Sequence, residues 1–153
     1  MSNVQPIPPG FHTVTPGLTV RDAARAIEFY KRAFGAVEKE RMNGPGGMIV
    51  HAELKIGDSI VFLGDEMPGM GNPSPQKLGG TSVTIHIYTE DVDAMYKRAI
   101  EAGATERMPL ADQFWGDRYG QVTDPFGHAW GIATHKEDLT EAQMMERMKA
   151  TMA

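Results

Sequence analysis

Apolar and polar residues follow two spacings along this chain, the alternation typical of strands and the spacing of three to four residues typical of helices. Strict alternation over residues 48–56 predicts a strand with one buried face. Runs rich in β-branched or aromatic residues at 18–20, 59–63, 83–87, 119–123 and 128–134 predict further strands. Two helices are predicted to begin at Asp22 and Asp91, and each has an apolar stripe at helical spacing. The stripes are Ala26, Ile27, Tyr30, Ala33 and Phe34, and then Val92, Met95, Tyr96, Ala99 and Ile100.

The two halves are copies of one another. Residues 30–42 read YKRAFGAVEKERM and residues 96–108 read YKRAIEAGATERM, with eight of thirteen positions identical. Such agreement at a fixed offset is typical of an internal repeat. Each half is predicted to fold as β-α-β-β-β. The fold class is therefore α+β, with two βαβββ modules in one domain over residues 13–134.

The modules are expected at residues 13–65 and 81–134, joined by a linker rich in Pro and Gly at residues 66–80. Residues 137–153 predict a C-terminal amphipathic helix, because Thr140 and Gln143 fit a capping box and Met144, Met148 and Met152 share one face. We expect this helix to pack on its own domain or on a dimer partner.

Composition narrows the classes of function. The chain of 153 residues has a net charge of −5, so we expect no nucleic-acid partner, since phosphate binding needs clustered positive charge. No apolar run is long enough to span a membrane, and the N-terminus lacks the apolar core of a signal peptide. The absence of cysteine excludes disulfides, thiolate metal sites and a Cys nucleophile. We therefore expect a cytoplasmic protein.

Several motifs resemble the vicinal oxygen chelate superfamily, which includes glyoxalase I, extradiol dioxygenases, fosfomycin-resistance enzymes and bleomycin-binding proteins. They are DxxxxIxFY at Asp22, FGA at Phe34, EDVDA at Glu90 and DPFGH at Asp124. The PhnB-like subgroup looks most similar, through HAELxIGDS at residues 51–59, FWGDRYG at residues 114–120 and DPFGHxW at residues 124–130.

The resemblance implies that the two sheets form a U-shaped trough, and that the protein is a homodimer. In the metalloenzymes of the family, His and Glu side chains hold a divalent ion there. The matching positions in this chain are Thr15, Thr84, Gly131 and either Phe62 or Leu63. None of these is a metal ligand, so the family's usual metal site is expected to be absent and no cofactor is expected.

Strand alternation predicts which side chains face the trough. His51 and Glu53 are expected there, with His86 from the strand at 83–87 as the third polar candidate for catalysis. The predicted ligand-binding residues are Thr84, Tyr88, Trp115, Arg118 and Gly131. Small residues around Gly131 predict a widened wall. Trp115 is expected to cover one end, together with Asp117, Arg118 and Tyr119.

Three interpretations of His51, Glu53 and His86 stay open. They are a polar wall with no catalytic role, contacts to a small-molecule ligand with acid–base chemistry, or a relocated metal site. The third would use two His and one carboxylate, a set that binds Zn, Ni, Mn or Fe.

The first hypothesis for function is a glyoxalase/bleomycin-resistance-like protein that binds a small organic molecule, with possible lyase or isomerase chemistry. The alternatives are a metal-dependent glyoxalase or dioxygenase using His51 and His86, and a non-catalytic dimeric interaction module.

Overall fold

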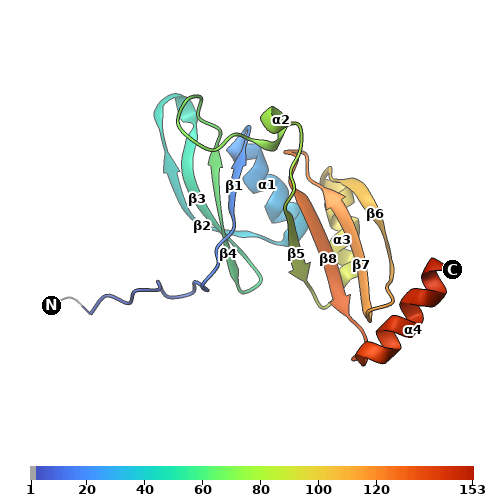
Figure 1. Cartoon of the computed structure of the whole chain (residues 1–153). Coiled ribbons are helices and arrows are strands. Elements are labelled where there is room, and N and C mark those ends of the chain that lie inside the picture. Colours follow the sequence, from blue (N-terminus) through green and yellow to red (C-terminus); the bar gives the residue numbers. More distant parts are fainter. Residues whose placement is uncertain (1–2) are drawn as a thin grey trace. The chain divides into compact units, whose positions relative to one another are not determined.

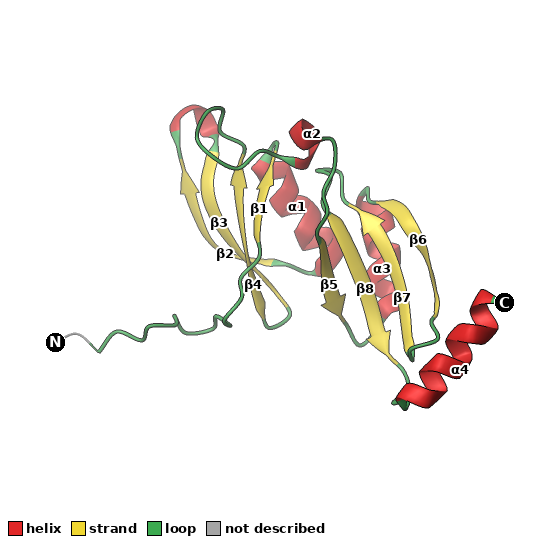
Figure 2. Cartoon of the chain, in the orientation of Figure 1, coloured by secondary structure: helices red, strands yellow, loops and turns green. Residues whose placement is uncertain are grey.

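A computed structural model describes residues 3–153, which divide into two compact units. Unit 1 ends at Thr81 and unit 2 comprises Ser82–Ala153. Each unit contains one four-stranded sheet and a helix that follows the first strand (Figures 1 and 2). The predicted α+β fold with two βαβββ modules is confirmed.

Unit 1 orders its strands β1-β4-β3-β2, with β1 parallel to β4 and the other neighbours antiparallel. Its elements are β1 (Gly17–Val20), α1 (Ala23–Phe34), β2 (Val37–Asn43), a 3₁₀ turn (Pro45–Gly47), β3 (Ile49–Ile56), β4 (Ser59–Asp65) and α2 (Pro75–Leu78). The one-turn helix α2 lies within the segment that the sequence marks as a linker.

Unit 2 repeats this order as β5-β8-β7-β6, again with the first strand parallel to the last. Its elements are β5 (Thr84–Tyr88), α3 (Val92–Ala102), β6 (Thr105–Asp112), β7 (Asp117–Thr123), β8 (Ala129–His135) and α4 (Glu141–Met152). The strands of the two units thus match one for one.

The predicted helix starts are confirmed. The side chain of Asp22 accepts a hydrogen bond from the backbone N–H of Arg25, and Asp91 does the same for Ala94. Each cap satisfies one of the donors that a helix leaves free at its first turn. The apolar stripes are buried except at Ile100, which is 38% exposed.

Helices α1 and α3 each cover one face of their own sheet. Helix α1 contacts β3 and β4, and α3 contacts β6, β7 and β8, as Figure 1 shows for α3 behind the second sheet. We call the opposite side of each sheet its open face. In β5 the side chains alternate as the sequence predicts: Ile85 and Ile87 are half-buried, and the open-face residues Thr84, His86 and Tyr88 are exposed.

Helix α4 begins with the predicted capping box of Thr140 and Gln143, but it buries none of its residues. Arg147 pairs with Glu137 just before the helix, with Nη1 2.7 Å from Oε2. No helix among residues 3–153 combines the length and apolar character needed to cross a membrane.

Candidate functional site

A buried carboxylate organises the open face of unit 2. Asp117, the first residue of β7, is only 4% exposed. Its Oδ2 accepts hydrogen bonds from the Tyr88 hydroxyl and from Trp115 Nε1, both at 3.1 Å. Its Oδ1 lies 2.7 Å from His135 Nδ1, because Asp117 and His135 are paired residues on β7 and β8. One carboxylate therefore fixes three aromatic side chains.

His135 bridges two carboxylates. Its Nε2 lies 2.8 Å from Oδ1 of Asp138, while its Nδ1 faces Asp117. Ionised carboxylates only accept hydrogen bonds, so the ring satisfies both when it is protonated at both nitrogens. Hydrogen bonds to Asp138 and then to Asp117 accordingly raise the pKa of His135.

The pKa of Asp117 reflects two opposed effects. Burial raises the pKa of this carboxyl group, but the hydrogen bonds from His135, Trp115 and Tyr88 outweigh burial and hold the pKa below its usual value. The same contact with Asp117, followed by burial, raises the pKa of the Tyr88 hydroxyl. Asp117 is thus an anion that holds its donors in place.

Four rings from β5, β7 and the turn before β7 pack together on this face, and we call them the aromatic platform. His86 stacks on Tyr119 with centroids 5.4 Å apart and planes 15° apart, and Tyr88 lies 4.6 Å from His86. Trp115 meets Tyr119 edge-on at 5.7 Å. Tyr88 is 65% exposed, whereas Tyr119 is buried. Burial lowers the pKa of His86, with Asp117 partly opposing it, which favours a neutral ring.

Gly131 lies beneath the platform, and the prediction of a widened wall there is wrong. A Cβ at this position would stand 2.8 Å from Tyr119 Cε2 and 3.2 Å from His86 Nδ1. The ring of Tyr119 therefore occupies the space that a side chain would need. Gln121 Nε2 donates to the Tyr119 hydroxyl at 2.6 Å and holds the ring there.

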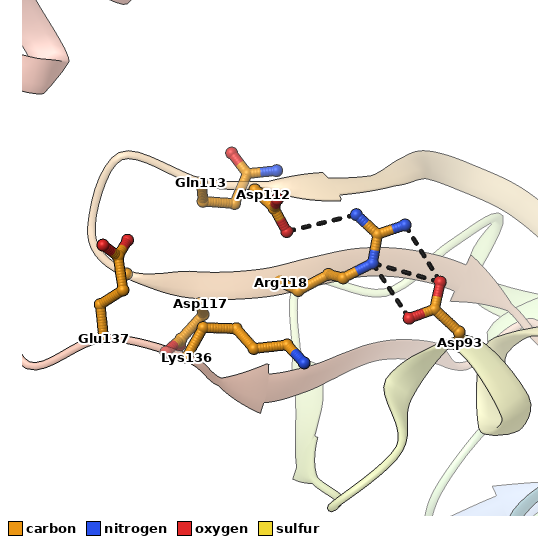
Figure 3. Close-up of a pocket in the computed structure, with 8 residues that line it drawn as sticks. Asp93, Asp112, Gln113, Asp117, Arg118, Lys136 and Glu137 are labelled. Carbon is orange, nitrogen blue, oxygen red and sulfur yellow. Dashed lines mark hydrogen bonds and ion pairs between the residues drawn. The ribbon is translucent and has the colours of Figure 1, made fainter.

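Arg118 points to the other side of β7. Its guanidinium lies between Asp93 on α3, with Nη2 3.0 Å from Oδ1, and Asp112 at the end of β6, with Nη1 3.2 Å from Oδ1 (Figure 3). These carboxylates line a polar cavity of about 510 Å³ with Arg118 and Lys136. Arg118 therefore belongs to an ion-pair network beside α3 and does not lie on the open face with Trp115, contrary to the expectation from the sequence.

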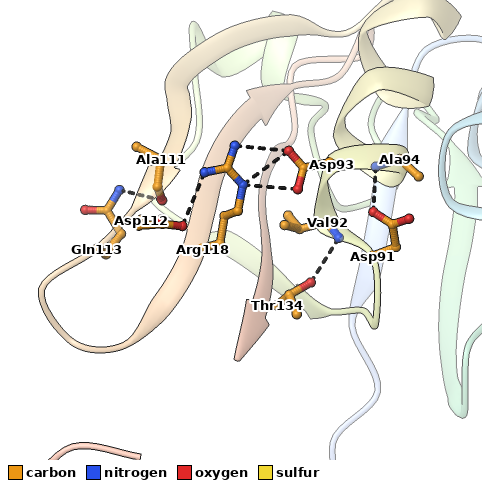
Figure 4. A network of polar contacts seen from close by, with 9 residues as sticks. All are labelled: Asp91, Val92, Asp93, Ala94, Ala111, Asp112, Gln113, Arg118 and Thr134. Carbon is orange, nitrogen blue, oxygen red and sulfur yellow. Dashed lines mark hydrogen bonds and ion pairs between the residues drawn. The ribbon is translucent and has the colours of Figure 1, made fainter. Parts of the chain in front are cut away.

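The same network joins the start of α3 to the sheet. The Val92 N–H donates to Thr134 Oγ1 at 2.9 Å, next to the Asp91 cap (Figure 4). Hydrogen bonds from Arg118 lower the pKa of Asp93. Arg118 is already engaged by two carboxylates, so it has little capacity to hold a further anion.

The remaining predicted residues divide between the units. In unit 1, His51 Nε2 lies 3.5 Å from Glu53 Oε1, and the His51 ring meets Phe62 edge-on with centroids 4.8 Å apart. His86 belongs to unit 2, and Thr84 lies on its open face opposite Ala129. The catalytic role of His51, Glu53 and His86 stays a prediction.

Sequence reasoning missed the hydrogen bonding that centres on Asp117 and includes His135. A signal was available, because alternation along β7 places Asp117 on the same face as Tyr119. Trp115 is 2 residues from Asp117 in the sequence, but Tyr88 and His135 are 29 and 18 residues away. Only the arrangement of the strands brings these two distant partners to Asp117.

The donor set does not fit the metal that the resemblance implies. Phe62 packs against His51, and the space beside Gly131 is filled by Tyr119. Across residues 3–153, no three His, Cys, Asp or Glu side chains gather in an arrangement that could hold a metal ion. We therefore derive no chemistry through a metal at the family's positions.

Comparison with known proteins agrees with the fold. TioX from Micromonospora sp. ML1 matches with a TM-score of 0.65 and 31% identity over 81% of this chain and 98% of that one. TnmS3, an antibiotic binding protein from Streptomyces sp. CB03234, shares the fold with a TM-score of 0.59 and 22% identity, over 89% and 100% of the chains.

A curated protein of Mycobacterium bovis, itself uncharacterized, is 46% identical over 154 residues, covering 99% of this chain and 95% of that protein. The family model for the glyoxalase/bleomycin resistance protein/dioxygenase superfamily matches residues 10–132. The paired βαβββ units and this match together establish that the chain belongs to the glyoxalase/bleomycin resistance protein/dioxygenase superfamily.

Proposed function

We propose that this protein binds a small planar organic molecule on the aromatic platform of unit 2, without a metal ion at the family's positions. The observation that carries the proposal is a set of exposed or half-exposed rings, His86, Tyr88 and Trp115, held in place around buried Asp117. A flat ligand would stack on these rings.

The arrangement favours binding because the rings are ordered before a ligand arrives. Hydrogen bonds to Asp117 and the stack on Tyr119 restrict the rotamers of Tyr88, Trp115 and His86. A ligand then does not have to order these side chains, each of which would otherwise cost about 0.5–1.5 kcal/mol. Aromatic pairs contribute a further ~0.5–1.5 kcal/mol beyond the area that they bury.

Two further points support the proposal. The lowered pKa of His86 favours a neutral imidazole, which a flat ligand can cover without the cost of removing a charge from water. The fold is shared by TnmS3, an antibiotic binding protein. We assign the chain to the PhnB-like subgroup on its motifs at residues 51–59 and 114–120, and we expect a homodimer.

The experiment is a binding titration with the full chain and two probes that each carry a planar aromatic group, bleomycin and anilinonaphthalene sulfonate. Tryptophan emission reports the platform, because Trp130 is buried and Trp115 is half-exposed. Tyr88→Ala should weaken binding of a probe about tenfold through loss of a stacking surface. The matched control is Ile100→Ala, which truncates a part-exposed apolar side chain of α3, on the other side of the sheet.

Binding that is equally weakened by Ile100→Ala, or is unchanged by Tyr88→Ala, would place the ligand elsewhere. If neither probe binds at concentrations up to the millimolar range, the platform is not a general site for planar molecules. Either result would overturn the proposal.

A further inference from the structure

The N-terminal arm of unit 1, residues 6–13, packs against the open face of its own sheet. The ring of Phe11 lies 5.9 Å from the ring of Phe62 on β4. His12 Nε2 lies 3.1 Å from the backbone oxygen of Asp58, in the turn between β3 and β4. Arm and sheet together line an open cleft of about 620 Å³, which we call the arm cleft.

The floor of the arm cleft is a row of three residues on neighbouring strands. Phe62 on β4 pairs with Glu53 on β3, and Glu53 pairs with Glu40 on β2. Paired residues project from the same face, so the phenyl ring and both carboxylates face the arm, from which Phe11 and Ile7 also line the cleft.

Two carboxylates lie side by side on this floor. Like charges directly opposite each other on paired strands are destabilising, and Glu40 and Glu53 are in this position. Among residues 3–153, no lysine or arginine forms an ion pair with either of them. Glu53 is 19% exposed, and its one ionisable contact is His51, which is not a permanent cation.

We propose that the arm cleft binds an organic cation, an ammonium or quaternary ammonium group carried on an apolar or aromatic body. The cationic group lies beside Glu53 and Glu40 and relieves their repulsion. The rings of Phe62 and Phe11 supply a cation–π surface, which contributes most where water is excluded. The apolar body lies against Ile7 and the prolines of the arm. This site is in unit 1 and does not rest on the platform of unit 2.

The test uses the uniformly ¹⁵N-labelled full chain and three small probes of similar size and different charge. They are benzyltrimethylammonium, benzyl alcohol and 3-phenylpropionate. Benzyltrimethylammonium should shift the amide resonances of Phe11, Glu53 and Phe62, and should bind at least about tenfold more tightly than either other probe. Glu53→Gln should reduce its affinity about tenfold, and Phe11→Ala about threefold.

The matched control is Glu146→Gln, which removes the same charge from the exposed surface of α4 in unit 2. It should leave the affinity unchanged. Equal affinity for the cation and the alcohol, or a loss in Glu146→Gln as large as that in Glu53→Gln, would overturn the proposal. Tryptophan emission reports unit 2, so failure in the arm cleft is distinguishable from failure at the platform.

Discussion

The substitution Asp117→Asn tests whether one carboxylate organises the open face of unit 2. The change preserves the shape of the side chain and removes its charge. An amide keeps a single acceptor oxygen and presents an N–H₂ group in place of the second oxygen. Asp117 serves three donors through both oxygens, so the amide cannot serve all of them.

The structure sets the size of the effect. Hydrogen bonds to a charged group contribute about 1.5–3 kcal/mol each, and those between neutral groups about 1 kcal/mol. If the amide oxygen takes the position of Oδ2, the bonds from Tyr88 and Trp115 survive as neutral ones and the contact with protonated His135 is lost. Removing a buried charge offsets part of this loss. We expect a net decrease of about 2 kcal/mol in the free energy of unfolding.

Urea unfolding followed by tryptophan emission measures the free energy of unfolding of unit 2, where Asp117 lies. Trp115 and Trp130 are the two tryptophans of the chain, and both belong to unit 2. The control is Asp112→Asn, the same change at an exposed carboxylate of the same sheet, which should unfold close to the unmodified protein. A loss below about 0.5 kcal/mol in Asp117→Asn would refute the reasoning, since surface substitutions alone produce changes of that size.

Further predictions concern titration, metal content and packing. In NMR titrations the pKa of His135 should lie above, and that of His86 below, the usual histidine value of 6.5. The stability that His135 contributes is fully present below pH 6.5 and is lost as the pH rises through the raised pKa. The reverse order of titration would contradict the contacts described. Protein incubated with Zn, Ni, Mn or Fe(II) and then desalted should retain no stoichiometric metal by elemental analysis; bound metal that is lost on His51→Ala or His86→Ala would instead show a relocated site. Gly131→Ala should destabilise unit 2 by about 1–3 kcal/mol in urea unfolding, because the new methyl group displaces the Tyr119 ring; an unchanged midpoint would contradict the close approach.

Local patterns predicted the fold well, because each element is specified by nearby residues. The helix caps at Asp22 and Asp91 and the capping box at Thr140 need only side chains three residues apart. The internal repeat then extended each half to a complete βαβββ module. The exposure of Ile100 at the edge of its stripe could not be read from periodicity, because periodicity does not say how far the sheet extends beneath a helix.

The candidate site was predicted only where strand alternation sufficed. Alternation placed His86 and Tyr88 on the open face, but it gave no indication that Asp117 accepts from Tyr88. That contact depends on strand register, which sets the neighbours across a sheet. Arg118 stands next to Tyr119 in β7, so its side chain projects from the opposite face of the sheet, toward Asp93. The folding back of Phe11 onto Phe62 had no periodic signal, because the arm has no regular structure.

The ring of Tyr119 over Gly131 constrains the order of mutations that could give this face a metal ligand. Gly131→Glu requires room for a Cβ, and Tyr119 Cε2 and Oη would stand 2.8 and 2.9 Å from it. Tyr119 would therefore have to become smaller first, and that step removes the ring on which His86 stacks. Each single change is disfavoured without the other. Position 131 is consequently coupled to position 119, and a mutational path toward metal binding crosses a less stable intermediate whichever substitution comes first.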